Sequence, residues 1–258
     1  MFFKFKSYFY FLSKSTNQHG VHSPFVFSLI TKCFYKKNSK ETITRFLNYK
    51  NNLLSNTQII SITDFGAGSK VFKSNQRQIS KIAKYAGITK KRAFLLSRIV
   101  TYFKPKNILE IGTSLGISTT AMHLGNENTQ ITSLEGCPET AAVAQQQFDQ
   151  HQFSNINLVV GNFNTTLEKS VKNQQFDLIY FDGNHQKEAT LQYFETCIQS
   201  AHNDSVFIFD DIHWSKEMEI AWQEIKKHPS VTVSIDTYQW GIVFFRKEQE
   251  KEHFTIRV

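Results

Sequence analysis

Short apolar runs alternate with stretches of helical spacing along the second half of this chain. The apolar runs cover residues 107–111, 131–135, 156–160, 177–181 and 204–210. The stretches with helical spacing cover residues 115–124, 138–150, 164–172, 186–200 and 215–228. Strands separated by helices form βαβ units, which give a parallel sheet with right-handed crossovers. The pattern therefore predicts five parallel strands with their connecting helices.

The alternation changes near the C-terminus. Residues 231–236 and 240–246 are two more strand-like runs, and only three residues separate them. A link of this length permits a hairpin but no parallel crossover. The predicted fold class is α/β, with a Rossmann-like sheet of seven strands that ends in an antiparallel hairpin.

Residues 1–88 show no such rhythm, and we expect a mainly helical extension to a domain of residues 89–258. Ser23 and Pro24 suit the cap and first turn of a helix that runs to about residue 35. Other helices are predicted at 42–54, 77–85 and 93–103. No low-complexity linker interrupts the chain, so the extension is expected to pack on the sheet domain.

The composition excludes several classes of protein. With 258 residues, 40% of them hydrophobic and 24 of them phenylalanine, the chain can bury a sizeable core. The net charge of +8 is spread over scattered lysines, which is typical of a solvated surface and argues against nucleic-acid binding. Cys33, Cys137 and Cys197 form no CxxC pair. We therefore expect neither a disulfide framework nor structural zinc, and a cytoplasmic location.

The segment of residues 1–14 is aromatic and basic. Its lysines interrupt the apolar run, which is shorter than the roughly 20 residues of a membrane span, and no small-residue cleavage site comes after it. The favoured interpretation is an arm that packs on the body or on a partner subunit. The alternative is a helix that lies on a membrane surface.

The segment from Asn107 to Ala121 carries the clearest chemistry. It reads as a buried strand with Glu110 near its end, a turn that holds Gly112 and Gly116, and then a helix. Glycine has no Cβ, so such a turn lets a polar ligand approach the backbone. Residues 59–69 offer a rival turn with an acid and paired glycines.

The sequence downstream of each turn distinguishes the two. A nucleotide site of this kind needs a second strand that ends in an acid, about 20 residues later, for the ribose hydroxyls. Glu135 ends such a strand after the first turn, whereas basic, helix-like sequence comes after the second. We therefore interpret residues 64–69 as a structural turn.

The glycine spacing then narrows the choice of cofactor. The pattern Glu110-x-Gly112-x-x-x-Gly116-x-Ser118 lacks the third glycine of a dinucleotide motif, which disfavours an NAD-linked oxidoreductase. Together with Glu135 and the terminal hairpin, it resembles motif I of the class I S-adenosylmethionine-dependent methyltransferases. The resemblance covers about residues 90–247 and implies S-adenosylmethionine as cofactor.

The resemblance also assigns roles to individual residues. Glu110 would help to hold the amino group of the cofactor, Ser118 its carboxylate and Glu135 its ribose. Asn162 would address the adenine amine, with an ordinary turn residue as the alternative, and Phe163 would form an apolar wall. The full set implied for the cofactor is Glu110, Gly112, Thr113, Ser114, Gly116, Ser118, Glu135, Gly136, Asn162, Phe163 and Asp182.

Acidic residues and histidines come after the fourth and fifth strands. Asp182 precedes His185, and the pair Asp210-Asp211 precedes His213. The carboxyl ends of parallel strands meet at one edge of a sheet, so these side chains are expected to converge. Adjacent carboxylates repel unless a cation or proton compensates, and hard oxygen ligands favour Mg²⁺, Mn²⁺ or Ca²⁺.

This arrangement resembles the catechol O-methyltransferase-like branch, where such acids bind a divalent metal. It implies a tentative site made by Asp182, Asp210 and Asp211, although that branch has an Asp-Asn pair where this chain has two aspartates. The branch uses a lysine base where this chain has His185, and the Asp-Gly-x-His sequence resembles methyltransferases that act on sugar or macrolide hydroxyls. We interpret His185 as the base and His213 as the second candidate; each is otherwise a polar loop or capping residue.

The predicted function is methylation of a small-molecule hydroxyl with S-adenosylmethionine, assisted by Mg²⁺ or another divalent cation. Two alternatives stay open, a cofactor-binding protein without catalysis and a nucleic-acid methyltransferase. The N-terminal extension resembles that of bacterial methyltransferase-like proteins. It also carries the interaction predicted for the aromatic N-terminus, either with a membrane surface or with a second copy of the chain.

Overall fold

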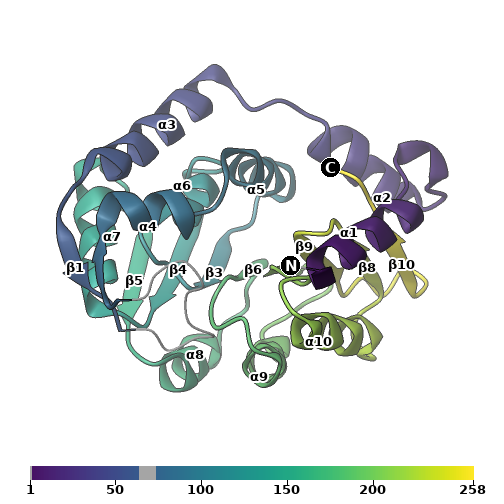
Figure 1. The fold of residues 1–258 in the computed structure, drawn as a ribbon. Coiled ribbons are helices and arrows are strands. Elements are labelled where there is room, and N and C mark those ends of the chain that lie inside the picture. Colours follow the sequence, from purple (N-terminus) through teal and green to yellow (C-terminus); the bar gives the residue numbers. More distant parts are fainter. Residues whose placement is uncertain (1, 64–73) are drawn as a thin grey trace.

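The computed structural model describes residues 2–63 and 74–258, so the rival turn at 64–69 lies outside the described residues. Within the described part, one sheet of eight strands forms the centre (Figure 1). Its strands are β3 (Asn107–Ile111), β4 (Gln130–Glu135), β5 (Ile156–Val160), β6 (Leu178–Phe181), β7 (Val206–Asp210), β8 (Val233–Asp236), β9 (Trp240–Phe244) and β10 (Glu252–Thr255). Their order across the sheet is β10-β8-β9-β7-β6-β3-β4-β5.

The predicted α/β fold is confirmed, with one addition. Strands β3 to β7 run parallel, and β9 pairs antiparallel with both β7 and β8 as the hairpin prediction required. The addition is β10, which pairs parallel with β8 at the edge of the sheet. The sheet therefore has eight strands and not seven.

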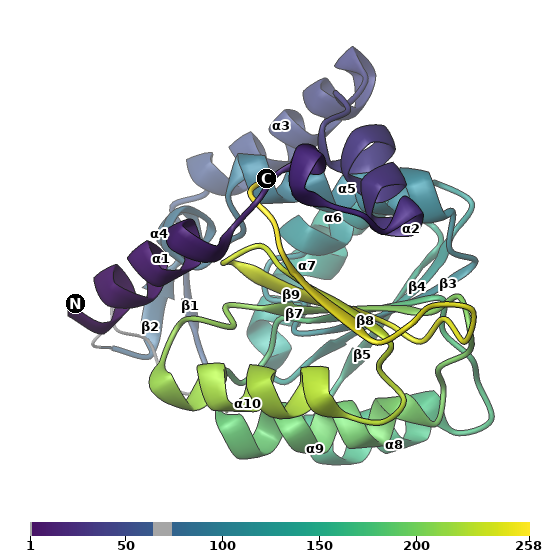
Figure 2. The same cartoon turned by 90° about the vertical axis from the view of Figure 1, so that its right-hand side faces the viewer.

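Helices cover both faces of the sheet (Figure 2). One face is covered by α5 (Lys90–Phe103), α6 (Ile117–His123) and α7 (Pro138–Gln150), and the other by α8 (Phe163–Val171), α9 (Lys187–Ile198) and α10 (Lys216–Lys227). These elements match the predicted helices to within a few residues. Each strand-to-helix connection therefore crosses over one face, as a βαβ arrangement requires.

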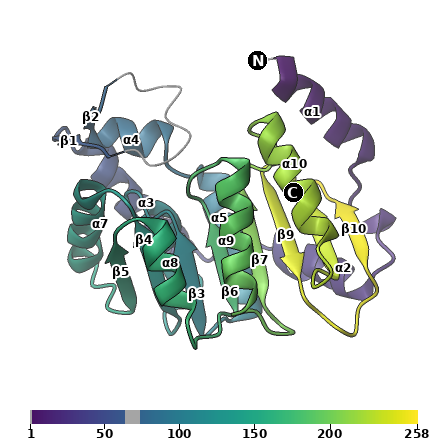
Figure 3. The ribbon, with the colours of Figure 1, turned by 90° about the horizontal axis from the view of Figure 1, so that it is seen from below.

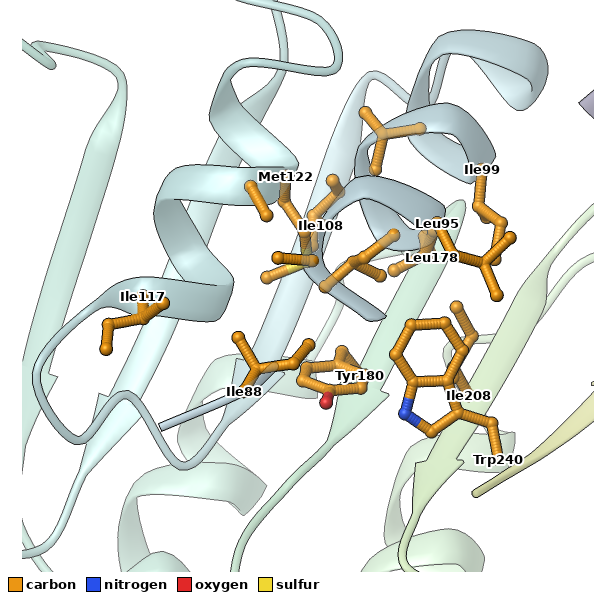
Figure 4. Close-up of a cluster of buried hydrophobic side chains, with 14 of the residues drawn as sticks. Ile88, Leu95, Ile99, Ile108, Ile117, Met122, Leu178, Tyr180, Ile208 and Trp240 are labelled. Atoms are coloured by element: carbon orange, nitrogen blue, oxygen red, sulfur yellow. The ribbon is translucent and has the colours of Figure 1, made fainter. Parts of the chain in front are cut away.

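Alternation along the strands builds a core on each face. In β6, Leu178 and Tyr180 join the cluster under α5 and α6, while Ile179 and Phe181 join the cluster under α9. Figure 4 shows the first cluster, in which Ile108 of β3 and Trp240 of β9 also take part. Burial of each such side chain contributes about 1.5–3 kcal/mol, so both faces fix the register of the sheet.

The N-terminal extension is mainly helical, as predicted. It consists of α1 (Phe2–Lys14), a 3₁₀ turn at Gln18–Gly20, α2 (Pro24–Leu29) with a π-helical turn at Ile30–Phe34, α3 (Lys40–Ser55), β1 (Ile59–Ser61), β2 (Gln76–Gln78) and α4 (Ile79–Tyr85). The two short strands form a separate antiparallel ribbon that was not predicted. Buried residues of α2 and α3, such as Leu29 and Phe46, belong to the same cluster as Ile108 of β3. The boundary at residue 88 stays a prediction.

Helix α1 is shorter than a membrane span, and across residues 2–63 and 74–258 every helix is too short or too polar to cross a bilayer. Phe5, Phe9 and Tyr10 are exposed on α1. Its contact with a membrane or with a second copy stays a prediction.

Candidate functional site

A cleft of about 850 Å³ opens at the carboxyl edge of the parallel strands. The turns after β3 to β7 form its floor, and residues of α4 and α5 form one wall. Lys4 of α1 and Tyr238 of the β8–β9 turn contribute to the opposite rim. Figure 3 shows that α1 and the β1–β2 ribbon lie at this same edge of the sheet. The site is thus assembled from segments far apart in the sequence.

Gly112 begins the turn after β3, and its conformation explains why a glycine is needed there. Its φ angle is +105°, and a Cβ at this position would lie 2.5 Å from the backbone oxygen of Asp182. Its N–H donates to the carbonyl of Leu134 at 2.9 Å. The turn is therefore pressed between two neighbouring strands, and its backbone lines the cleft.

Gly116 packs behind the cleft. Its φ angle is +71°, and a Cβ there would meet the ring of Phe148 and the hydroxyl of Tyr49, each at 2.6 Å. Gly116 is not among the residues that line the cleft, whereas Thr113 and Ser114 are. It permits close packing of α6 against α3 and α7, and its contact with a cofactor stays a prediction.

Glu110 lies behind the turn and not on the cleft wall. It is fully buried and accepts hydrogen bonds from the hydroxyls of Ser118 at 2.6 Å, Ser133 and Thr119. Burial raises the pKa of Glu110 to about 7, although the three hydroxyls oppose this rise. Three protein hydroxyls bond with its carboxyl oxygens and Glu110 is not among the residues that line the cleft, so the contact with the cofactor's amino group stays a prediction. Glu110 positions Ser118, which lines the cleft.

Glu135 is held in place at the end of β4 and faces the cleft as predicted. Its Oε2 accepts from the N–H of Ser114 at 2.6 Å, and its Oε1 accepts from the N–H of Cys137 at 2.9 Å. Ser114 reaches this position with a φ angle of +50°. The carboxylate thus joins the β3 turn to the β4 turn, with Gly136 beside it in the lining.

Asn162 and Phe163 come directly after β5 and its turn, and both line the cleft. The Oδ1 of Asn162 accepts from the N–H of Asn164 at 2.9 Å and caps α8. The capping role is the one expected of an ordinary turn residue, and the contact with the adenine amine stays a prediction. Phe163 packs edge-on against Tyr193 with ring centres 6.0 Å apart, and it offers the predicted apolar wall.

Asp182, Asp210 and Asp211 converge as predicted, but an arginine lies among them. The Nη1 atom of Arg92 is 2.7 Å from Oδ1 of Asp210 and 3.6 Å from Oδ1 of Asp211. Burial raises the pKa of Asp182, and the charge of Asp210 and a hydrogen bond with it add to this effect. Burial disfavours the charge on Arg92, but Asp210 and the neighbouring groups outweigh it and raise its pKa.

The predicted divalent-metal site does not fit this arrangement. The guanidinium of Arg92 already binds the carboxylate oxygen of Asp210 that a cation would need. Among the His, Cys, Asp and Glu side chains of residues 2–63 and 74–258, no group of three has a geometry that could hold a metal ion. Arg92 thus places a positive charge beside Asp210 and Asp211.

His185 lines the cleft beside Asp182. Its Nε2 is 3.6 Å from Oδ1 of Asp182, and its side chain is 26% exposed. Both residues lie in the loop at the end of β6, so the strand end fixes their separation. The imidazole remains accessible from the cleft, as a base must be.

The imidazole of His213, the second candidate base, contacts two carboxylates at the rim of the cleft. Its Nδ1 is 2.7 Å from Oε1 of Glu219, and its Nε2 is 2.9 Å from Oδ2 of Asp236. Burial lowers its pKa, but these two carboxylates outweigh burial and raise it. Both ring nitrogens are thus engaged, and His213 supports the rim of the cleft.

The rim includes residues that sequence reasoning missed. Ser7 of α1 donates to Oε1 of Glu219 at 2.5 Å, and Tyr238 donates to the carbonyl of Lys4 at 3.0 Å. The ammonium of Lys4 lies 3.2 Å from the centre of the Trp214 ring. The sequence contains one signal for the contact of α1 with the rim. The segment of residues 1–14 is both aromatic and basic, and such a segment is suited to covering an acidic site.

Comparisons with known proteins bear on the fold and on the cleft. Residues 109–212 match the model of a family described as a methyltransferase domain. No curated protein matches the chain.

Solved structures of low identity share the fold. The chain is similar to an SAH-bound methyltransferase from Podospora anserina, at 14% identity and a TM-score of 0.61, with 82% of this chain and 90% of that chain covered. It is also similar to an SAH-bound O-methyltransferase from Bacillus cereus, at 18% identity and a TM-score of 0.55, over 81% of this chain and 92% of that one. A putative caffeoyl-CoA O-methyltransferase from Staphylococcus aureus matches at 18% identity and a TM-score of 0.55, over 64% and 90%.

Proposed function

We propose that this chain, which carries a class I S-adenosylmethionine-dependent methyltransferase domain, methylates a hydroxyl oxygen of a small molecule. The family match supports the transferase class, and two of the similar structures bear names of O-methyltransferases. The residues around the cleft support the choice of oxygen. We also place the reaction in the cytoplasm, since Cys33, Cys137 and Cys197 are buried as free thiols.

The cleft suits S-adenosylmethionine in size and in lining. Its volume of about 850 Å³ lies within the range of roughly 300–1,000 Å³ usual for ligand pockets. Glu135 presents a carboxylate that backbone N–H groups hold in place, and Phe163 presents an apolar face. When bound, the cofactor supplies a methyl group on a positively charged sulfur. Ser118 and the backbone of the Gly112 turn would hold its methionine end.

The observation that carries the choice of reaction is the pair of His185 and Asp182 at the end of β6. A hydroxyl is a weak nucleophile until it loses its proton, and a histidine with an ordinary pKa of about 6.5 can accept that proton near neutrality. The cofactor would supply the methyl group and would leave as a neutral thioether. The proton of the hydroxyl would move to Nε2 of His185, which lies 3.6 Å from Oδ1 of Asp182.

The test is turnover by the His185→Gln variant. Glutamine keeps a polar side chain but cannot act as a base near neutrality, so we expect turnover to fall by about a hundredfold or more. Binding of S-adenosylhomocysteine, measured by calorimetry, should change by less than about twofold. The matched control is His202→Gln, because His202 also pairs with an aspartate, Asp177, but lies away from the cleft.

The screen for an acceptor uses labelled S-adenosylmethionine with fractions of small molecules and, separately, with DNA and RNA. Transfer to small hydroxyl compounds supports the proposal. Transfer to nucleic acid alone would replace it with the nucleic-acid alternative. Cofactor binding without transfer to any fraction would favour a binding protein.

A further inference from the structure

We propose that the guanidinium of Arg92 takes the place of a divalent cation in this site, so that methyl transfer proceeds without a bound metal. Exclusion of the cation depends on the geometry of the site alone. Methyl transfer without a metal rests, in addition, on the proposed function.

The position of Arg92 is fixed by helix α5. Thr89 caps this helix and accepts the N–H of Arg92, and the buried side chains of Leu96 and Ile99 anchor the helix to the sheet. The arginine side chain then extends to the ends of β6 and β7, where it is 21% exposed. Because the helix is anchored, the positive charge is a built-in part of the site.

The contact of Arg92 with Asp210 uses the acceptor that a metal would need. Nη1 lies 2.7 Å from Oδ1 of Asp210, whose side chain is only 6% exposed. A Mg²⁺ ion binds carboxylate oxygen at about 2.0–2.1 Å, so it could reach Oδ1 only by displacing the guanidinium. The two cations would also repel each other at so short a separation. Arg92 and a metal are therefore alternatives at Asp210.

A second carboxylate shares the contact with Arg92. Asp211 lies 3.6 Å from the same Nη1 atom, so one guanidinium serves both Asp210 and Asp211. A metal ion at these two carboxylates would have to replace both contacts. The proposed exclusion of a cation therefore depends on two of the three aspartates and not on Asp210 alone.

The direct test is Mn²⁺ binding by the full-length protein, measured by electron paramagnetic resonance. Wild type should not bind at millimolar Mn²⁺. The Arg92→Met variant keeps much of the length of the side chain but loses its charge, so the freed carboxylates should bind one Mn²⁺ about tenfold or more tightly than wild type does. Lys91→Met is the matched control, since Lys91 also carries a positive charge but bonds with the carbonyl of Val258.

Each outcome decides the proposal. One Mn²⁺ bound by wild type would overturn it, and so would a failure of both proteins to bind, because Arg92 would then not be what keeps the cation out. If Arg92→Met does not fold, Arg92→Gln takes its place. Its side chain is polar but carries no charge, so it should show the same gain in Mn²⁺ binding, and no gain in either variant would overturn the proposal.

A second arm addresses the reaction. Turnover by wild type should change by less than about twofold on addition of EDTA or Mg²⁺. A loss of turnover in EDTA that Mg²⁺ restores would overturn the metal-free part of the proposal. If no acceptor is ever methylated, the proposed function fails, yet the Mn²⁺ comparison still decides the role of Arg92.

Discussion

The imidazole of His213 stacks on the ring of Tyr238, with ring centres 5.1 Å apart and planes inclined by 14°. The two residues come from different segments, the loop after β7 and the β8–β9 turn. Both contact α1, since Ser7 hydrogen-bonds with His213 and Tyr238 with the backbone of Lys4. Helix α1 packs on this stack and forms part of the rim of the cleft.

We expect His213→Gln to loosen α1 from the body. The charged imidazole bonds with Glu219 and Asp236, and loss of such charge-assisted bonds costs about 1–3 kcal/mol. Its pKa in the folded state lies above the ordinary value, so this contribution is present at pH below about 6.5 and declines as the pH rises through the folded-state pKa. Hydrogen exchange of the α1 amides at about pH 6 and about pH 8 measures the effect.

In wild type, protection of α1 should fall between these two pH values, and in His213→Gln it should be low at both. His228→Gln is the control, because His228 pairs with Glu195 far from α1. Equal protection of α1 in wild type and His213→Gln would refute the role of this histidine.

Glu135→Gln should weaken binding of S-adenosylhomocysteine by about tenfold or more. The carboxylate is the acceptor expected for the ribose hydroxyls, and an amide retains only one of its two oxygens. Glu139→Gln is a suitable control: Glu139 is an exposed acid in the first turn of α7 and does not line the cleft. Calorimetry on both variants separates the local contact from the general loss of one negative charge. Equal affinities would remove Glu135 from the cofactor site.

The pH dependence of the free energy of unfolding should reflect the protonation of Glu110. Its pKa is about 7 when folded, against an ordinary value of 4.5, so the folded state keeps a proton that the unfolded chain loses. The free energy of unfolding should therefore decrease as the pH rises from about 4.5 to 7, by about 3 kcal/mol, and then level off. Urea denaturation across this range measures it.

Glu110→Gln resembles the protonated form and should lack this decrease. Its unfolding free energy above about pH 7 should exceed that of wild type, provided that Ser118, Thr119 and Ser133 keep their contacts. The same pH profile in both proteins would show that burial does not hold the proton on Glu110.

Gly112→Ala should disrupt the turn beneath the cofactor. The new methyl group would lie 2.5 Å from the backbone oxygen of Asp182, so β3 and β6 would have to separate at their ends. The positive φ angle adds a backbone strain of about 1–3 kcal/mol. We expect a lower melting temperature and a loss of cofactor binding. A variant that binds the cofactor with wild-type affinity would show that the turn tolerates a side chain.

The sheet and its helices could be predicted because local pattern and tertiary position agree. The central strands are apolar runs buried on both faces, such as Leu178–Phe181, and such runs remain legible without knowledge of their neighbours. Strand β10 could not be found in this way. Its sequence, Glu252–Thr255, is mostly polar and partly exposed, and its place depends on the edge that β8 leaves open.

In the site, too, some residues could be predicted from the local sequence and others could not. The positions of Glu135, Asp182 and Asp210 follow from strand ends, since a parallel sheet brings those ends together. Arg92 was missed because a basic residue just before a predicted helix, at 93–103, gives no sign of where its side chain goes. Three carboxylates at two neighbouring strand ends did require a compensating cation, so a search for basic residues in the flanking helices would have found it.

Contacts between segments far apart in the sequence have a consequence for biosynthesis. Ser7 bonds with Glu219, 212 residues further along, and Thr16 bridges to Ile256 beside β10. A ribosome makes α1 long before it makes these partners. The part of the cleft built around β3 to β5 is therefore translated before α1 can take its place on the rim. The cleft is complete only once the segment that holds Glu219 and Tyr238 has been made.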